Sequence, residues 1–144
     1  MAVFVTVASD QVQIVTAHFV RLWRVRLRGS VRMQKIFHHT GVITDQPQPG
    51  EIFVAASKVW VTSPDDHPYR IEFLRFEPDS PVHGPVRNRC HTAYLVTDLN
   101  AAIQGANVLL GPFDPLEGLR VVFIEENGAV VEYMEFSGGR TSIS

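Results

Sequence analysis

The sequence predicts an α+β domain, rich in strands and made of two similar units. Short apolar stretches are separated by clusters that hold nine prolines and ten glycines, which favours a sheet-rich fold over a helical bundle. Residues 90–136 follow the order β-α-β-β-β, and residues 36–77 follow the order strand, loop, strand, strand. The second order is the first without its helix, so we predict a weak internal repeat within one domain, residues 34–137.

The first unit begins with a strand over Ile36–Ile43. The prolines and glycine of residues 45–50 exclude regular structure there. Two further strands are predicted over Lys58–Thr62 and Arg70–Glu77, and the proline-rich residues 78–89 are predicted to be a lid or a linker.

The second unit opens with a strand over His91–Thr97, and Asp98 is a suitable N-cap for a helix. That helix has one apolar face, formed by Leu99, Ala102, Ile103 and Ala106. Asn127-Gly128 predicts a hairpin turn. The strands expected around it are Val108–Leu110, Leu119–Glu125 and Ala129–Phe136.

The ends of the chain differ from the domain. Residues 1–33 carry five arginines against Asp10, a net charge of +4, whereas residues 34–144 carry −6. Residues 11–28 are basic and amphipathic, with both helix-like and strand-like spacing. We expect the basic extension to be either a covering helix or a segment foreign to the domain, with Met33 as an alternative start. Residues 138–144 are predicted to be a flexible tail.

Composition excludes several classes of function. The net charge of −2 and the pI near 6.3 offer no electrostatic footprint for nucleic acid. No apolar run approaches the roughly 20 residues that span a bilayer, and the start lacks a basic signal region, so we expect a cytoplasmic protein without a membrane partner. The single cysteine, Cys90, excludes an internal disulfide and a multi-cysteine zinc site, and we expect it to be a small buried residue.

Four strands each place one metal-competent side chain among apolar neighbours on one face, because side chains alternate along a strand. These are His39, Glu72, His91 and Glu132. His38 is the nearest rival of His39 and is expected on the opposite face. Burying isolated carboxylates costs several kcal/mol, and a divalent cation held by two imidazoles and two carboxylates removes that cost. The alternative is four unrelated residues at the surface or in ion pairs.

The stretches Phe37–Ile43, Tyr69–Phe73, His91–Leu99 and Asn127–Tyr133 resemble, in order and spacing, the signature strands of the vicinal oxygen chelate superfamily. This superfamily includes glyoxalase I, epimerases, extradiol dioxygenases and bleomycin-resistance proteins. The resemblance implies paired βαβββ modules, the first without its helix, which form a cupped, mainly antiparallel half-barrel. It implies the same four metal ligands and a homodimer. The bare face of the first module would be covered by residues 11–28 or by a second subunit.

The resemblance further implies a metal-dependent lyase or isomerase that acts on a small oxygenated metabolite through a metal-stabilised enediolate. Zinc, nickel, cobalt, manganese or iron would suit these ligands, and Glu132 or Glu72 would move the proton. The alternatives are a non-catalytic binding protein of the bleomycin-resistance type and an extradiol-type dioxygenase.

Five further residues are candidates for substrate binding. Arg70 would grip an anionic group, or else pair with a nearby acid. His67 would sit at the cavity mouth as a proton shuttle, unless it is merely exposed. Trp60, Phe113 and Met134 would line an apolar pocket, although core packing is the commoner role of such side chains.

Overall fold

The computed structural model describes residues 4–8, 11–15 and 33–139, in two units that divide after Arg32. In the first unit, β1 (Phe4–Ala8) and β2 (Gln11–Val15) pair as an antiparallel hairpin. The covering helix expected within residues 11–28 therefore does not include Gln11–Val15, and residues 16–28 lie outside the described residues. The same holds for residues 140–144 of the predicted tail.

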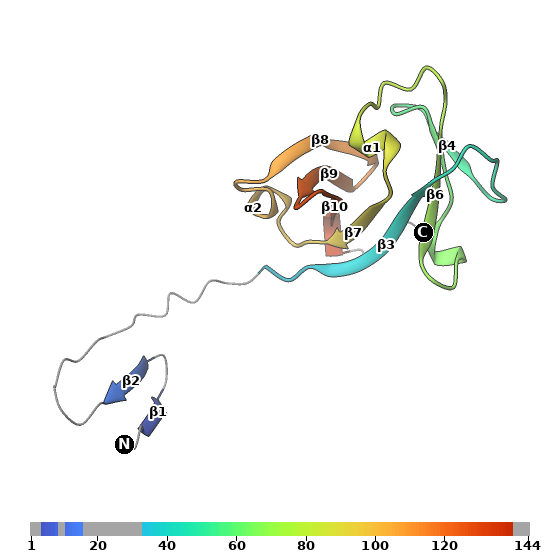
Figure 1. Cartoon of the computed structure of the whole chain (residues 1–144). Coiled ribbons are helices and arrows are strands. Elements are labelled where there is room, and N and C mark those ends of the chain that lie inside the picture. Colours follow the sequence, from blue (N-terminus) through green and yellow to red (C-terminus); the bar gives the residue numbers. More distant parts are fainter. Residues whose placement is uncertain (1–3, 9–10, 16–32, 140–144) are drawn as a thin grey trace. The chain divides into compact units, whose positions relative to one another are not determined.

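The second unit is a strongly curled, mixed sheet of eight strands (Figure 1). Its strands are β3 (Ile36–Ile43), β4 (Ile52–Val54), β5 (Val59–Val61), β6 (Ile71–Phe76), β7 (His91–Leu95), β8 (Asn107–Leu116), β9 (Leu119–Glu126) and β10 (Ala129–Phe136). The helices are short: η1 (Pro64–Asp66), α1 (Pro85–Asn88), α2 (Leu99–Ala102) and η2 (Ser137–Gly139). The expected α+β half-barrel is confirmed at this level.

The strand order is β4-β5-β6-β3-β7-β10-β9-β8. The parallel pairs β3/β6 and β7/β10 flank the antiparallel pair β3/β7 at the centre, and the outer pairs are antiparallel. Each half therefore has the same order from the centre of the sheet to its edge: the first strand of that half along the chain, then its fourth, third and second strands. The first half has four strands, one more than the sequence predicted, because β4 lies between the proline-rich residues 45–50 and the strand predicted over Lys58–Thr62, where no strand was expected.

The predicted local signals are confirmed in the second half. The Asp98 side chain accepts a hydrogen bond from the Ala101 N–H at 2.9 Å, which caps α2. Asn127 and Gly128 both have positive φ, as a tight hairpin turn requires. The helix is shorter than expected and ends at Ala102, whereas β8 extends well beyond the predicted Val108–Leu110.

Alternate side chains of β9 supply two separate clusters of the core. Val122 and Ile124 pack with Tyr133 beneath Leu99 of α2. Val121 and Phe123 pack on the opposite face with Met134 and with Val82 and Val86, which belong to the segment predicted as a lid or linker. This second face of the sheet carries the candidate site. Within the described residues, no helix is long and apolar enough to cross a membrane.

Candidate metal site and pocket

The four predicted ligands come from the four central strands of the curled sheet. Glu72 lies on β6, His39 on β3, His91 on β7 and Glu132 on β10, and these strands are consecutive neighbours. Parallel pairing on each side of the central antiparallel pair aligns the four positions across the sheet. Because side chains alternate between the two faces of a strand, the four side chains lie on the same face of the sheet and meet there.

Two small residues make room for these side chains. Gly41 is the register partner of both Glu72 and His91, and Ala93 is the register partner of both His39 and Glu132. A Cβ atom on Gly41 would lie 2.0 Å from Cε1 of His91, so the imidazole occupies the space over this glycine. Ligand-bearing and small residues thus alternate between neighbouring strands.

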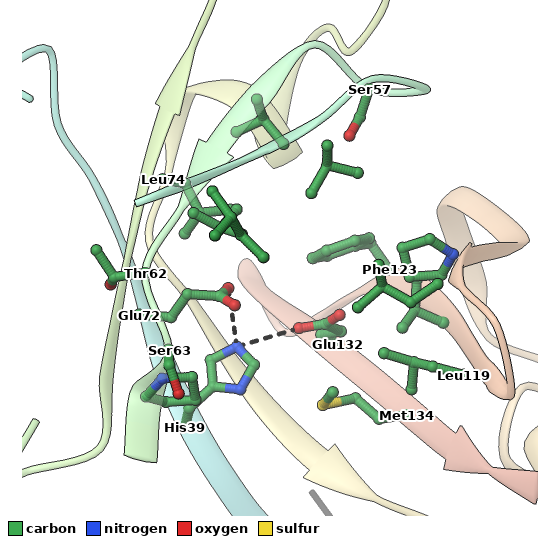
Figure 2. Close-up of a pocket in the computed structure, with 18 of the residues that line it drawn as sticks. His39, Ser57, Thr62, Ser63, Glu72, Leu74, Leu119, Phe123, Glu132 and Met134 are labelled. Atoms are coloured by element: carbon green, nitrogen blue, oxygen red, sulfur yellow. Dashed lines mark ion pairs between the residues drawn. The ribbon is translucent and has the colours of Figure 1, made fainter. Parts of the chain in front are cut away.

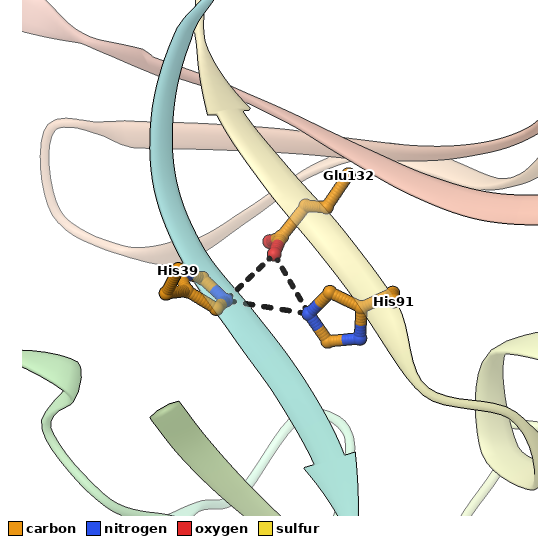
Figure 3. Close-up of side chains that lie close together, drawn as sticks. All are labelled: His39, His91 and Glu132. Atoms are coloured by element: carbon orange, nitrogen blue, oxygen red, sulfur yellow. Dashed lines mark hydrogen bonds and ion pairs between the residues drawn. The ribbon is translucent and has the colours of Figure 1, made fainter. Parts of the chain in front are cut away.

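Three of the side chains form a compact triad (Figure 3). Oε2 of Glu132 lies 3.3 Å from Nε2 of His39 and 3.2 Å from Nε2 of His91, and the two Nε2 atoms are 3.3 Å apart. All three residues are buried, with 6% or less of their surface exposed. Their donor atoms lie within 4.8 Å of one another, close enough to hold a metal ion.

Glu72 approaches the triad from one side. Its Oε2 lies 3.3 Å from Nε2 of His39, and its side chain is 16% exposed, against 8% for that of Glu132. Among the described residues its ion pair is with His39 alone, whereas Glu132 contacts both histidines. Glu72 is thus beside the metal-competent group rather than within the set of mutually close donors.

The carboxylates determine the charge of His39. Burial lowers the pKa of an imidazole, but hydrogen bonds with Glu132 and Glu72 outweigh burial and raise the pKa of His39 to about 9. Burial by itself would raise the pKa of Glu132, but hydrogen bonds with His39 and His91 lower it to about 2. Without a metal, a proton on His39 therefore provides the positive charge between the two carboxylates.

His38 also points into the site, so the expectation that it faces the other way is wrong. The register between β3 and β7 shifts between Phe37 and His39, which is a β-bulge. The bulge turns two consecutive imidazoles inward, and Nδ1 of His38 lies 2.8 Å from Nδ1 of His39. Burial, followed by the charge on His39, lowers the pKa of His38 to about 4, so His38 is the neutral partner of this pair.

The donor set fits a first-row transition metal. Nitrogen and oxygen ligands about 2.1 Å from one ion lie about 3.0–3.4 Å apart in octahedral or tetrahedral geometry, and the measured separations are 3.2–3.3 Å. The Nε2 atoms that face the carboxylates are buried together with them, away from water. Two imidazoles and a carboxylate are ligands that zinc, iron, manganese, cobalt and nickel accept.

A pocket of about 240 Å³ opens beside the metal-competent group (Figure 2). His38, His39, Glu72 and Glu132 lie at its polar end. Its remaining walls are mainly apolar and come from β4, β5, β6, β8, β9 and β10 and from the segment around Val82. Further polar residues in the wall are Ser57, Thr62, Ser63 and Asp65. Two of the residues predicted to bind substrate, Phe113 and Met134, line this pocket, as does Phe76.

Arg70, His67 and Trp60, predicted to bind substrate as well, do not line the pocket. Nε of Arg70 donates to the His38 carbonyl oxygen and its Nη1 donates to Oδ1 of Asp65, both at 2.6 Å, so it is the ion-paired arginine of the alternative prediction. Nδ1 of His67 accepts from the Tyr69 N–H. Trp60 lies on the opposite face of β5 from the pocket residues Val59 and Val61 and donates to Glu77.

Cys90 precedes His91 on the chain and is exposed, so the prediction that it is buried is wrong. It lies between α1 and β7, where the chain enters the sheet. No family model matches this chain, and a search of curated proteins finds no significant relative. The structure itself therefore defines the class: a curled, mixed eight-stranded sheet whose central strands place two histidines and a glutamate to hold a metal ion.

Proposed function

We propose that the protein is a metal-dependent enzyme of the vicinal oxygen chelate superfamily, a lyase or isomerase of the glyoxalase and epimerase type. The main support is that His39, His91 and Glu132 converge beside a pocket. Glu72 reaches His39 from β6, the strand next to β3. The matching strand order of the two halves supports the assignment of residues 36–77 and 90–136 as paired modules, with a loop in place of the first helix. Each half contributes a histidine from its first strand and a glutamate from its last.

The bound ion would attract two neighbouring oxygens of a small metabolite and stabilise negative charge that develops on them. His39, His91 and Glu132 would hold the ion. The two carboxylates have different tasks because their contacts differ. Glu132 is shared by two imidazoles, which fixes it, whereas Glu72 contacts only one imidazole and is the more exposed of the two carboxylates that line the pocket. Glu72 is therefore the residue that removes a proton from the substrate carbon and returns it.

Metal analysis tests the site. Protein purified without chelator is expected to contain close to one equivalent of a transition metal by elemental mass spectrometry, and His39→Ala and Glu132→Ala are expected to lose it. His83→Ala is the matched control, because His83 is exposed and outside the pocket. An absence of metal from the parent protein, or unchanged metal in both ligand variants, overturns the proposal.

Turnover is tested with 2-oxoaldehyde adducts and acyl-CoA epimers, by following exchange of the substrate C–H proton with D2O. Glu72→Gln is expected to retain metal and lose exchange, whereas Glu132→Gln is expected to lose both. Metal binding without exchange or turnover of any such compound favours a binding protein instead.

One observation favours a second candidate, an extradiol-type dioxygenase. The mutually close donors are two histidines and one carboxylate, which is the ligand set of non-haem iron oxygenases with open positions for oxygen. Iron as the native metal, together with oxygen uptake in the presence of a catechol, would select this candidate. Zinc or nickel, with no oxygen uptake, would exclude it.

A further inference from the structure

The pocket beside the metal-competent group indicates what kind of molecule fits there. We infer, resting on the proposed function, that the part of the ligand that enters this pocket is uncharged apart from the oxygens that bind the metal. Its body is apolar, a single ring or a short branched chain. The inference concerns the part of the ligand that does not react, and three features of the pocket carry it.

The first feature is the wall. Beyond the polar end, most of the wall consists of aliphatic and aromatic side chains from both halves of the sheet: Val59 and Leu74 from the first half, and Leu119, Phe123 and Met134 from the second. These five residues are themselves buried. An apolar ligand body would leave water for a surface of mainly the same character, whereas a polar body would lose its hydration and find few partners, the hydroxyl groups of Ser57, Thr62 and Ser63 among them.

The second feature is the sign of the charges. The charged side chains in the pocket wall are Asp65, Glu72 and Glu132, all acidic. Two arginines lie beside residues of the wall without lining the pocket: Arg70 donates to Asp65 and to the His38 carbonyl group, and Arg87 lies over the Phe76 ring and donates to the Glu77 carbonyl group. Within the pocket wall, a carboxylate or phosphate on the ligand body would therefore find no lysine or arginine side chain to offset the cost of leaving water.

The third feature is size. A dry apolar cavity of about 150 Å³ holds one benzene molecule, and this pocket has a volume of about 240 Å³. One substituted ring with two oxygens therefore fits, whereas a nucleotide-sized group would have to remain outside. Val82 and Val86, both buried, close the pocket from the segment before β7.

Hydroxamates with one chelating head and different bodies test this inference. The probes are acetohydroxamate, benzohydroxamate and 4-carboxybenzohydroxamate, and their affinities for the metal-loaded protein are measured by calorimetry. Benzohydroxamate is expected to bind about 10- to 100-fold more tightly than acetohydroxamate, because its ring is buried. The carboxylated probe is expected to lose most of that gain.

A charge placed in the pocket is the reciprocal test. Leu116→Arg introduces a cation at a half-buried wall position and is expected to reverse the preference between the two aromatic probes. Val108→Arg is the matched control: it lies on the same strand, is 41% exposed and does not line the pocket. Circular dichroism and thermal melting of both variants show that they remain folded.

Two failures have different meanings. If the protein binds metal but binds the three probes equally, or prefers the carboxylated probe, the inference about the ligand is overturned and the metal site stands. If the protein binds neither metal nor any hydroxamate, the proposed function and the inference are both overturned.

Discussion

Replacement of Gly41 by alanine tests whether the space over this residue positions the metal-competent histidine of β7. The new Cβ would lie 2.0 Å from Cε1 and 2.3 Å from Nε2 of His91. Ordinary contact begins near 3.4 Å, so the ring has to move by about 1.4 Å. The φ of Gly41 lies outside the left-handed region, so the backbone itself accepts alanine.

The movement has two measurable costs. The ring is buried against Phe123 and His39, with ring centroids 5.1 and 5.4 Å away, so it cannot shift without displacing them. Overpacking of this kind lowers the free energy of unfolding by about 1–3 kcal/mol. Because the displaced atom is itself a ligand, we expect the metal affinity to fall by at least about 100-fold, the upper range for loss of a supporting residue.

A double-mutant cycle separates the clash from other effects. Metal-free parent, Gly41→Ala, His91→Ala and the double variant are unfolded with urea, and metal binding is titrated in each. Without the imidazole, alanine at position 41 fits and is expected to raise the free energy of unfolding by about 0.5–1 kcal/mol, as for glycine replaced within a strand. The two substitutions should therefore couple by about 1.5–4 kcal/mol. Coupling below about 0.5 kcal/mol, or parental metal affinity in Gly41→Ala, refutes this account of the site.

Three further predictions concern the protons of the site. Since the pKa of His39 rises from 6.5 to about 9, its contribution to stability is complete below pH 6.5 and is lost as the pH rises through 9, about 3 kcal/mol for the metal-free protein. The lowered pKa of His38, about 4 against 6.5, makes stability fall as the pH drops from 6.5 towards 4, and the lowered pKa of Glu132 makes it fall further below pH 4.5. Urea unfolding across pH 3–10 should therefore show a maximum near pH 6.5. Metal binding at pH 7.5 should release about one proton, from His39. In calorimetry, the binding heat should then depend on the ionisation enthalpy of the buffer, and a heat that is the same in all buffers would contradict the assignment. Replacement of His38 by phenylalanine removes the acceptor beside Nδ1 of His39 and should weaken metal binding by about 10- to 100-fold, whereas His38→Asn should restore part of it; equal affinities would deny His38 a positioning role.

The alternation of faces along strands was sufficient to predict all four side chains that meet at the site. It depends on the chain keeping a period of two, and it failed for His38 because a bulge between Phe37 and His39 adds one residue to β3. A bulge depends on the pairing of β3 with β7, so local sequence does not reveal it. The unpredicted strand β4 has the same explanation: Ile52–Val54 is three residues long and exists through pairing with β5 at the edge of the sheet.

The residues that line the pocket were harder to predict than the residues expected to bind the metal. Trp60 and Arg70 are large side chains within predicted strands, which suited a pocket, but each is bound to a partner elsewhere in the chain: Trp60 to Glu77, and Arg70 to Asp65. Phe113 reaches the pocket because β8 continues through it far beyond the apolar run that predicted this strand. The glycine of the His39-x-Gly41 stretch was the local signal for the site, and its role becomes clear only from its register with His91.

The pairing of the two halves also explains why the site calls for a divalent ion. Each half brings one imidazole and one carboxylate to the central strands, so two negative charges meet beneath an apolar pocket. In the metal-free protein the proton on His39 neutralises only one of them, which leaves a buried negative charge. A divalent cation neutralises both and displaces that proton, and the site then becomes uncharged without any contribution from a lysine or arginine. The electrostatic gain on metal binding therefore requires both glutamates, and replacing Glu72 by glutamine should weaken binding less than replacing Glu132, because only Glu132 contacts both histidines.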